Sequence, residues 1–206
     1  MEEKDIHSEL ASIRSLMERS SRFLSLSGLS GVMAGIYALI GAFTGYRLVS
    51  KKYGSLTISD SYSDNPQVYH QLLLIATVIL LLSVLTCLIL SIREAKKKNE
   101  NYWNPVSKRL ISSMAIPLFT GGLFIIILLL KAEYSLIASA CLIFYGLSLI
   151  SASQYTFSDV RWLGFCQIIL GLMAAMIPES GLWFWVFGFG FLHIIYGSVM
   201  HFKYKQ

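Results

Sequence analysis

Charged side chains are scarce in this sequence: Asp, Glu, Lys and Arg make up 14% of the 206 residues, while hydrophobic residues make up 55%. A soluble domain carries about a quarter charged residues. The charges that are present gather between long apolar blocks. Charge this sparse and this unevenly placed indicates a polytopic membrane protein rather than a soluble domain.

The net charge of +5 could also suggest a nucleic-acid partner. We set that interpretation aside because the basic residues lie at the ends of apolar blocks, where the positive-inside rule accounts for them. The partners that we expect are the lipid bilayer and, as open alternatives, a second copy of the chain or another membrane protein.

Carboxylates are absent from the middle of every apolar block. Asp and Glu inside a membrane are the usual signature of ion and proton pathways, so their absence weakens a coupled-transporter interpretation. The sequence also lacks HExxH, GxSxG and P-loop motifs. Haem ligation would need two histidines at matching depth, and His70 and His193 do not match. We therefore expect no enzyme, no catalytic residue, no metal site and no cofactor.

Cysteine is rare as well, and each of the three cysteines lies inside an apolar block: Cys87, Cys141 and Cys166. The count is odd and no CxxC pair occurs, so neither a disulfide framework nor a zinc site is expected. We interpret all three as free thiols that pack like small hydrophobic residues.

The sequence does contain six charge-free apolar stretches, each of a length that suits a spanning helix of about 20 residues. Only helices and closed barrels satisfy their backbone hydrogen bonds in lipid, and continuous rather than alternating apolar runs exclude a barrel. The sequence thus predicts an all-α transmembrane domain over 23–206 after an N-terminal segment over 1–22. Its six helices are expected at about 23–47, 68–92, 110–130, 134–155, 160–177 and 181–201.

The loop over 93–109 carries six basic residues against two acidic ones, and it separates the second and third stretches. Lys and Arg resist translocation, so this loop belongs on the cytoplasmic side. With this loop inside, both termini are also cytoplasmic. Thirteen Lys and Arg residues then lie on the cytoplasmic side, against four outside.

Residues 1–22 have the pattern of an amphipathic helix. Ile6, Leu10, Ile13 and Met17 recur at steps of four, three and four, so they lie on one helical face. We expect this helix to lie on the cytoplasmic membrane surface as an extension of the first span, with binding of a partner as the alternative.

Small residues form a second pattern in the first span. They lie on one face of the predicted helix and comprise Ser27, Gly31, Gly35, Ala38, Ala42 and Gly45. Small side chains allow helix backbones to approach closely, which drives helix packing in lipid. We interpret this face as a helix-packing surface within one chain, with a dimer contact as the alternative.

Short connections at 131–133 and 179–181 predict that the third and fourth spans, and the fifth and sixth, form tight antiparallel hairpins. Tyr145-Gly146 near the end of the fourth span and Tyr196-Gly197 near the end of the sixth lie 51 positions apart. This correspondence suggests three tandem hairpins related as an internal repeat.

Three polar side chains in the last three spans reach a similar depth. At about 1.5 Å per residue, Ser148, Gln167 and His193 lie roughly 21, 20 and 18 Å from the outer face. Tyr196 shares a helical face with His193. We predict a polar cluster of these four residues in which a neutral His193 bridges Gln167 and Ser148. An interhelical hydrogen-bond network is the favoured interpretation, and a small polar pocket is the alternative.

The segment 163–197 has the sequence LGFCQIILGLMAAMIPESGLWFWVFGFGFLHIIYG. It resembles the hairpin repeat of the bacterial HdeD-type acid-resistance membrane proteins. The shared pattern is an apolar helix with glycine, a turn with proline, and a second helix that ends in an apolar-Gly motif. The resemblance extends loosely over 110–155 and does not include the first hairpin. It implies six spans in a bacterial inner membrane and a stress-related role, and it brings no catalytic residues.

The expected function is that of a non-enzymatic accessory or stress-related protein of a bacterial-type inner (cytoplasmic) membrane. The alternative is a small-molecule permease or channel with a polar pocket near His193. A membrane-embedded enzyme is a third and weaker alternative.

Overall fold

The computed structural model describes residues 27–53, 66–97 and 102–204, and within these ranges every regular element is helical. The predicted amphipathic helix over 1–22 lies outside the described residues. The long helices are α2 (Gly28–Tyr53), α3 (Pro66–Lys97), α4 (Pro105–Leu130), α5 (Ile137–Ala152) and α6 (Asp159–Met176). The last part of the chain forms α7 (Gly181–Trp185), a π-helical segment η3 (Val186–Leu192) and α8 (His193–Tyr204). Two short turns of 3-10 helix, η1 (Tyr134–Leu136) and η2 (Pro178–Ser180), precede α5 and α7.

Six helices in the described part are long and apolar enough to cross a membrane. They cover Gly28–Ser50, His70–Lys97, Pro105–Leu130, Tyr134–Ala152, Asp159–Met176 and Gly181–Tyr204. The last of these joins α7, η3 and α8 into one continuous helical run. The predicted all-α class with six candidate spans is confirmed at this level.

Large apolar side chains cover the outside of these helices. On α3, none of the residues in the most apolar window is buried, and Leu74 and Leu85 are 64% and 57% exposed. On α4, Phe119 is 70% exposed. In water such a continuous apolar surface would drive aggregation, whereas in a bilayer it contacts lipid chains. The surface therefore suits a multi-pass membrane protein.

Several helices extend beyond the predicted spans, because a helix continues past the lipid boundary until a capping signal ends it. The α4 helix starts at Pro105, five residues before the expected span at 110, and Asn104 followed by Pro105 predicts this start as an N-cap and a first-turn proline. Asn104 caps it: its Oδ1 accepts from the Ser107 backbone N–H at 2.8 Å, and the Ser107 Oγ lies 3.0 Å from the Asn104 backbone nitrogen. The α3 helix likewise continues through the charged residues to Lys97.

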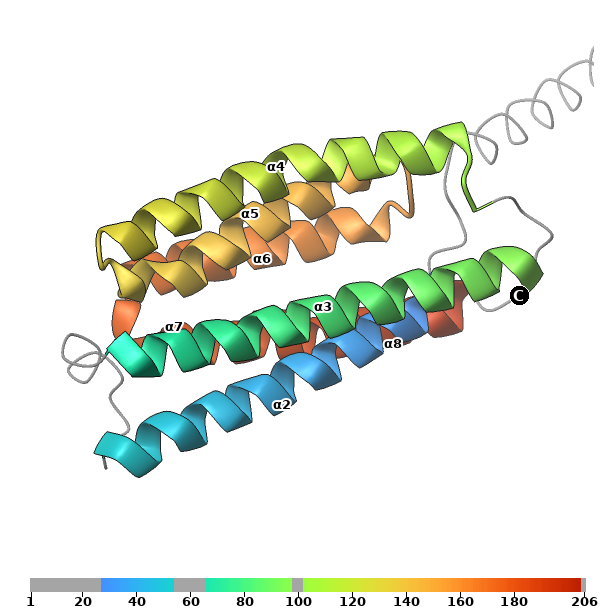
Figure 1. The fold of residues 1–206 in the computed structure, drawn as a ribbon. Helices are drawn as coiled ribbons and strands as arrows, with labels where there is room; N and C mark the ends of the chain where they lie inside the picture. Colours follow the sequence, from blue (N-terminus) through green and yellow to red (C-terminus); the bar gives the residue numbers. More distant parts are fainter. Residues whose placement is uncertain (1–26, 54–65, 98–101, 205–206) are drawn as a thin grey trace, which may run out of the picture.

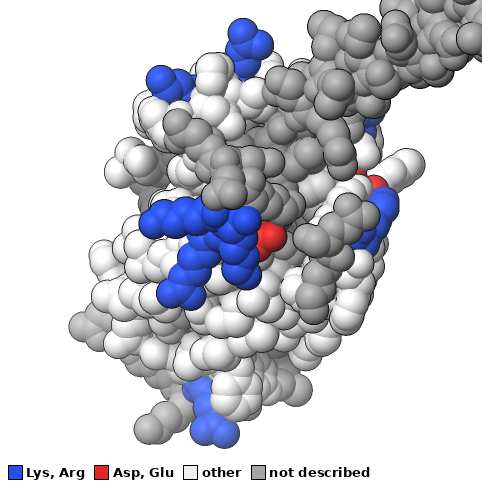
Figure 2. Space-filling model, turned by 90° about the vertical axis from the view of Figure 1, so that its right-hand side faces the viewer, with Lys and Arg blue, Asp and Glu red and all other residues white. Residues whose placement is uncertain are grey.

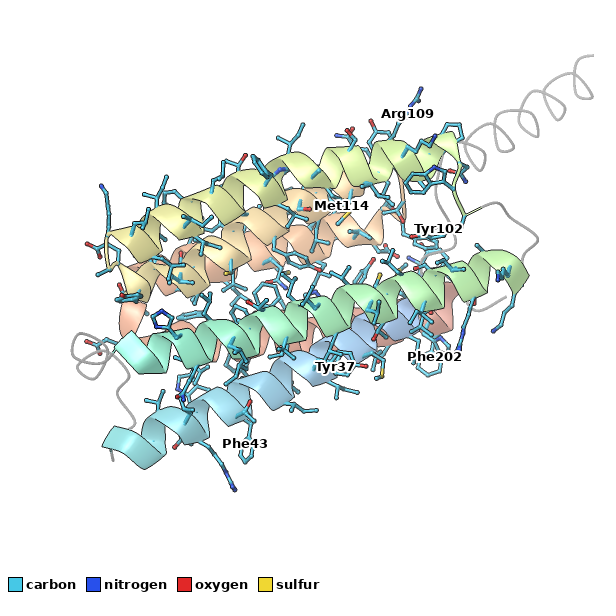
Figure 3. The ribbon with its side chains drawn as sticks, viewed as in Figure 1. Tyr37, Phe43, Tyr102, Arg109, Met114 and Phe202 are labelled. Carbon is cyan, nitrogen blue, oxygen red and sulfur yellow. The ribbon has the colours of Figure 1, made fainter. Side chains whose placement is uncertain are left out.

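The long helices form two groups (Figure 1). In the first group, α5 packs against both α4 and α6. In the second group, α2 packs against both α3 and α8. Tyr37 on α2 points toward α3, where its hydroxyl lies 3.3 Å from the Thr86 Oγ1 (Figure 3). The segment α7 leads from the first group to the second, and η3 packs against α2.

The predicted hairpin between 160–177 and 181–201 keeps its two spans in contact near the turn and again at the far end, where Lys203 of α8 pairs with Asp159 of α6. The α6 helix contacts α7 and η3, whereas α8 packs extensively on α2 in the other group. By contrast, the spans on either side of 131–133, which are α4 and α5, pack directly on each other. The most extensive packing of all joins α5 to α6. The three-hairpin arrangement stays a prediction, because the most extensive packing joins helices of different predicted hairpins.

Basic side chains gather at the end of the bundle where α3 ends and α4 begins (Figure 2). This end of the described chain carries Arg93, Lys96, Lys97, Lys108, Arg109, Arg161 and Lys203. Here Lys203 also pairs with Asp159 across α8 and α6, with 2.7 Å between Nζ and Oδ2. We call this the basic end, and the end where α2 stops and α5 starts the opposite end.

Candidate functional site

A π-helical segment shapes the interior around the predicted polar cluster. Residues Val186–Leu192, with the sequence VFGFGFL, interrupt the last span between α7 and α8. Such segments are rare in proteins and often occur at functional sites. Here Gly188 presents its carbonyl oxygen to α6, where it accepts a hydrogen bond from the Gln167 Nε2 at 2.8 Å. The segment thus supplies the cluster with a backbone acceptor inside the membrane-spanning region.

His193 is the centre of the cluster. Its Nδ1 lies 2.9 Å from the Gly188 oxygen, and its Nε2 lies 2.9 Å from the Tyr145 hydroxyl. A carbonyl oxygen can only accept, so Nδ1 must carry the hydrogen. In the neutral imidazole Nε2 then accepts from the Tyr145 O–H. Both ring nitrogens therefore have partners within the protein.

Gln167 is fully buried beside His193. Its Nε2 also lies 3.4 Å from the His193 Nδ1. We do not count this contact as a hydrogen bond, because both atoms donate to the same carbonyl oxygen. The Gln167 Oε1 is buried and has no hydrogen-bond partner among the described residues. A buried acceptor without a partner costs free energy on the order of 1–3 kcal/mol.

Ser148 does not join His193, so this part of the prediction is wrong. Its Oγ donates instead to the Met114 carbonyl oxygen on α4, at a long 3.4 Å. The reason is rotational: Ser148 follows Tyr145 by three residues, which places its side chain about 60° away around the helix axis and about 4.5 Å further along it. Tyr145 faces His193, and Ser148 faces α4. Depth alone did not reveal this difference.

Tyr196, the fourth predicted member, lies on α8 but makes no hydrogen bond with the other three. Its hydroxyl is buried without a partner among the described residues. Its ring packs instead against an apolar cluster that includes Leu149, Leu163 and Met200. The structure thus brings together Gln167 and His193 and leaves Ser148 and Tyr196 outside their hydrogen-bond network.

Tyr145 is the residue that the sequence interpretation missed. Its depth would have identified it, since eleven residues from Tyr134 correspond to about 16 Å, close to the value for His193. Aromatic rings complete its surroundings. The Phe189 ring lies 5.3 Å from the Tyr145 ring and 5.9 Å from the His193 ring, and Trp185 lies 4.5 Å from Phe189. The hydrogen-bonded groups are therefore enclosed by apolar and aromatic side chains.

The predicted packing face of the first span lies against two different helices. A Cβ on Gly35 would be 2.7 Å from the Gly190 oxygen of η3, and one on Gly31 would be 3.2 Å from the Gly197 Cα of α8. Further along α2, a Cβ on Gly45 would meet Leu72 of α3 at 3.1 Å. Ala38 and Ala42, between these positions, are both buried.

The start of this face differs by one residue from the prediction. Gly28, rather than Ser27, makes the close approach, since a Cβ on Gly28 would lie 2.7 Å from the Gly197 oxygen. Ser27 is half-buried, and its carbonyl oxygen accepts from the Ser30 Oγ at 2.6 Å.

The two Tyr-Gly pairs of the sequence have the same structural role. A Cβ on Gly146 of α5 would lie 2.7 Å from the Gly164 oxygen of α6, and one on Gly197 of α8 would lie 2.7 Å from the Gly28 oxygen of α2. Each glycine therefore marks the close crossing of its helix with a neighbour. The correspondence reflects similar packing in the two helix groups.

No cluster of three or more His, Cys, Asp or Glu side chains that could hold a metal ion occurs among the described residues. The three cysteines are free, and Cys166 is exposed on the outside of α6.

No protein-family model matches this chain, and no curated protein or solved structure shows significant similarity to it. The resemblance of residues 163–197 to the HdeD-type repeat therefore receives no support from a family match. The proposals that follow are supported by the sequence pattern and the geometry.

Proposed function

We propose that this chain is a non-enzymatic integral protein of a bacterial-type inner membrane with an accessory or stress-related role. In this proposal the His193 cluster has a structural role: its hydrogen bonds hold the two helix groups together. The observation that carries it is the occupation of both ring nitrogens of His193 by Gly188 and Tyr145. A general acid or base needs a ring nitrogen within reach of its substrate. An imidazole bonded in this way leaves no nitrogen free for that task.

The proposed topology has both termini in the cytoplasm, with residues 1–22 as an amphipathic helix on that membrane surface. We propose that the six spans form three consecutive helix pairs, each joined by a connection on the outer side of the membrane. The basic end of the bundle supports this orientation, because Lys and Arg are retained on the cytoplasmic side of bacterial membranes.

The experiment compares His193→Leu with Ile195→Leu in cells that lack the native gene. Ile195 is 58% exposed on the outside of α8, so its substitution serves as a matched control in the same helix. Survival after acid challenge is measured at matched protein levels, together with thermal unfolding in detergent. A structural role predicts that His193→Leu lowers stability and leaves survival equal to that of the control. Lost survival in a variant that folds normally would overturn this proposal.

A small-molecule permease or channel is the second candidate, and two atoms favour it. The Gln167 Oε1 and the Tyr196 hydroxyl are buried without partners among the described residues. Either atom is able to hydrogen-bond a small polar solute passing through the interior. Uptake of such solutes into liposomes by the purified protein, abolished by Gln167→Leu, would support this function. Liposomes that take up no more solute than protein-free liposomes would exclude it for the solutes tested.

A further inference from the structure

A cavity of about 190 Å³ lies at the opposite end of the bundle, away from the His193 cluster. It separates α2 and α3 on one side from the start of α5 and from α7 on the other. Close to it, Leu182 of α7 and Leu72 of α3 both pack against Val49 of α2, which connects the two groups at this end. The cavity is a space between helix groups whose outer faces contact lipid.

The walls of the cavity are almost entirely apolar. Ile75, Ala76 and Ile79 line it from α3, and Ile137 and Ala138 line it from the start of α5. A polar solute would lose its hydration here without gaining hydrogen bonds, which makes its binding unfavourable. The lining therefore fits a hydrocarbon ligand.

The dimensions of the cavity narrow the choice of ligand. Its lining runs from Gly41 to Val49 on α2 and from Leu72 to Ile79 on α3. These lengths correspond to about 11–12 Å along a helix axis, which lies within one leaflet of a hydrocarbon core of about 30 Å. A helix of a second copy, about 10 Å across with its side chains, would occupy roughly 900 Å³ over this length, several times the cavity volume of about 190 Å³. A single acyl chain is thin enough.

Among the described residues that line the cavity, one is charged, and it is acidic. Glu179 lies in the turn before α7, together with Tyr134 and Ser135 at the start of η1. These residues stand at helix ends, where we expect the lipid headgroups. The nearby cation of α2 is engaged elsewhere: the Arg47 guanidinium lies 4.8 Å from the ring centroid of Phe43, which points away from the bundle (Figure 3). A headgroup that carries an ammonium ion would complement Glu179.

We propose that this cavity holds one acyl chain of a phospholipid from the leaflet at the opposite end, with the headgroup ammonium of phosphatidylethanolamine beside Glu179. The acyl chain fills the cavity, where the side chains of the two helix groups do not pack against each other. This site depends on membrane insertion and is independent of the role proposed for His193.

The test is retention of lipid by the purified protein, measured by native mass spectrometry after exchange into equal amounts of phosphatidylethanolamine and phosphatidylglycerol. The unmodified chain is expected to retain several-fold more phosphatidylethanolamine. Glu179→Gln is expected to make the retention of the two lipids equal. Ala76→Phe, which fills the cavity, is expected to lower retention of both lipids at least fivefold. Val78→Phe, on the lipid-exposed side of α3, is the control and should behave as the unmodified chain does.

Equal retention of the two lipids by the unmodified chain, or undiminished retention by Ala76→Phe, would overturn the proposal. A dimer that dissociates in Ala76→Phe would also overturn it, because the cavity would then be a contact between copies. If Ala76→Phe does not fold, photocrosslinking of the unmodified chain with a phospholipid that carries a diazirine on its acyl chain replaces it. Crosslinks on 72–79 and 134–138 are expected, and their absence from both segments would contradict the proposal.

Discussion

At the scale of single residues, the contact between Tyr145 and His193 explains how a neutral polar group is tolerated inside the spans. Gly188, Gln167, His193 and Tyr145 belong to three separate parts of the chain: α5, α6 and the last span. Each hydrogen bond in lipid contributes only about 0.6 kcal/mol on average, with values up to about 1.7 kcal/mol. Such bonds set the rotation of the helices about their axes more than they set total stability.

We predict that Tyr145→Phe lowers the free energy of unfolding by roughly 1 kcal/mol, because the His193 Nε2 loses its donor while the ring stays in place. The measurement is unfolding in detergent with increasing SDS. Tyr155→Phe is the control, since the Tyr155 hydroxyl makes no hydrogen bond within the described residues and its ring packs near Ala152.

A double-mutant cycle between Tyr145→Phe and His193→Leu separates this bond from general packing. The effects of the two changes on the free energy of unfolding should deviate from additivity by about 0.5–1 kcal/mol, as expected for residues in direct contact. A cycle between His193→Leu and Gln167→Leu should show a smaller coupling, because these side chains share only the Gly188 acceptor. Strict additivity in the first cycle would show that the Tyr145–His193 contact contributes nothing to stability.

Part of this cluster is predictable from the sequence, because residue spacing determines how deep each side chain lies in the membrane. Depth in a spanning helix follows from counting residues, so counting places Gln167 and His193 at a similar depth, and the structure brings the Gln167 Nε2 within 3.4 Å of the His193 Nδ1. Rotation about the helix axis depends on which neighbours pack where, and the sequence contains no measure of that, so Ser148 was misassigned and Tyr145 was missed. The π-helical segment has no compositional signature beyond its two glycines, yet it supplies the Gly188 acceptor.

At the scale of helices, small residues determine which spans meet. The α2 helix approaches α8 through Gly28, Gly31 and Gly35, and α5 approaches α6 through Gly146 and Gly164. The sequence predicted the packing face of the first span but not its partner. Short loops predict which consecutive spans pair, but they do not show that α8 also packs extensively on α2.

We predict that Gly35→Leu lowers the thermal unfolding midpoint in detergent by several degrees. The new side chain would collide with the Gly190 oxygen and with Ile194, which forces α2 away from the last span. The neighbouring Ile36→Leu is the control because Ile36 is 38% exposed on the other side of the helix. Equal midpoints for the two variants would show that this face of α2 is not a packing surface.

At the scale of the whole molecule, two groups of three helices pack into a bundle with an apolar exterior, a polar cluster inside and basic residues at one end. Sequence reasoning recovered the number of spans and their approximate positions, because hydrocarbon thickness fixes the length of an uncharged apolar stretch. The Asn104–Pro105 pair predicts the start of the third helix, and the helix begins there, before the charges of Lys108 and Arg109.

The central claim is that six spans cross the membrane with the basic end in the cytoplasm. Fusions of a reporter that is active only outside the cytoplasm test it directly, at one site within 50–65 and at a second site within 95–105. The positive-inside rule predicts activity at the first site and silence at the second. Activity within 95–105 together with silence within 50–65 would contradict the orientation, and the same result at both sites would contradict a span between them.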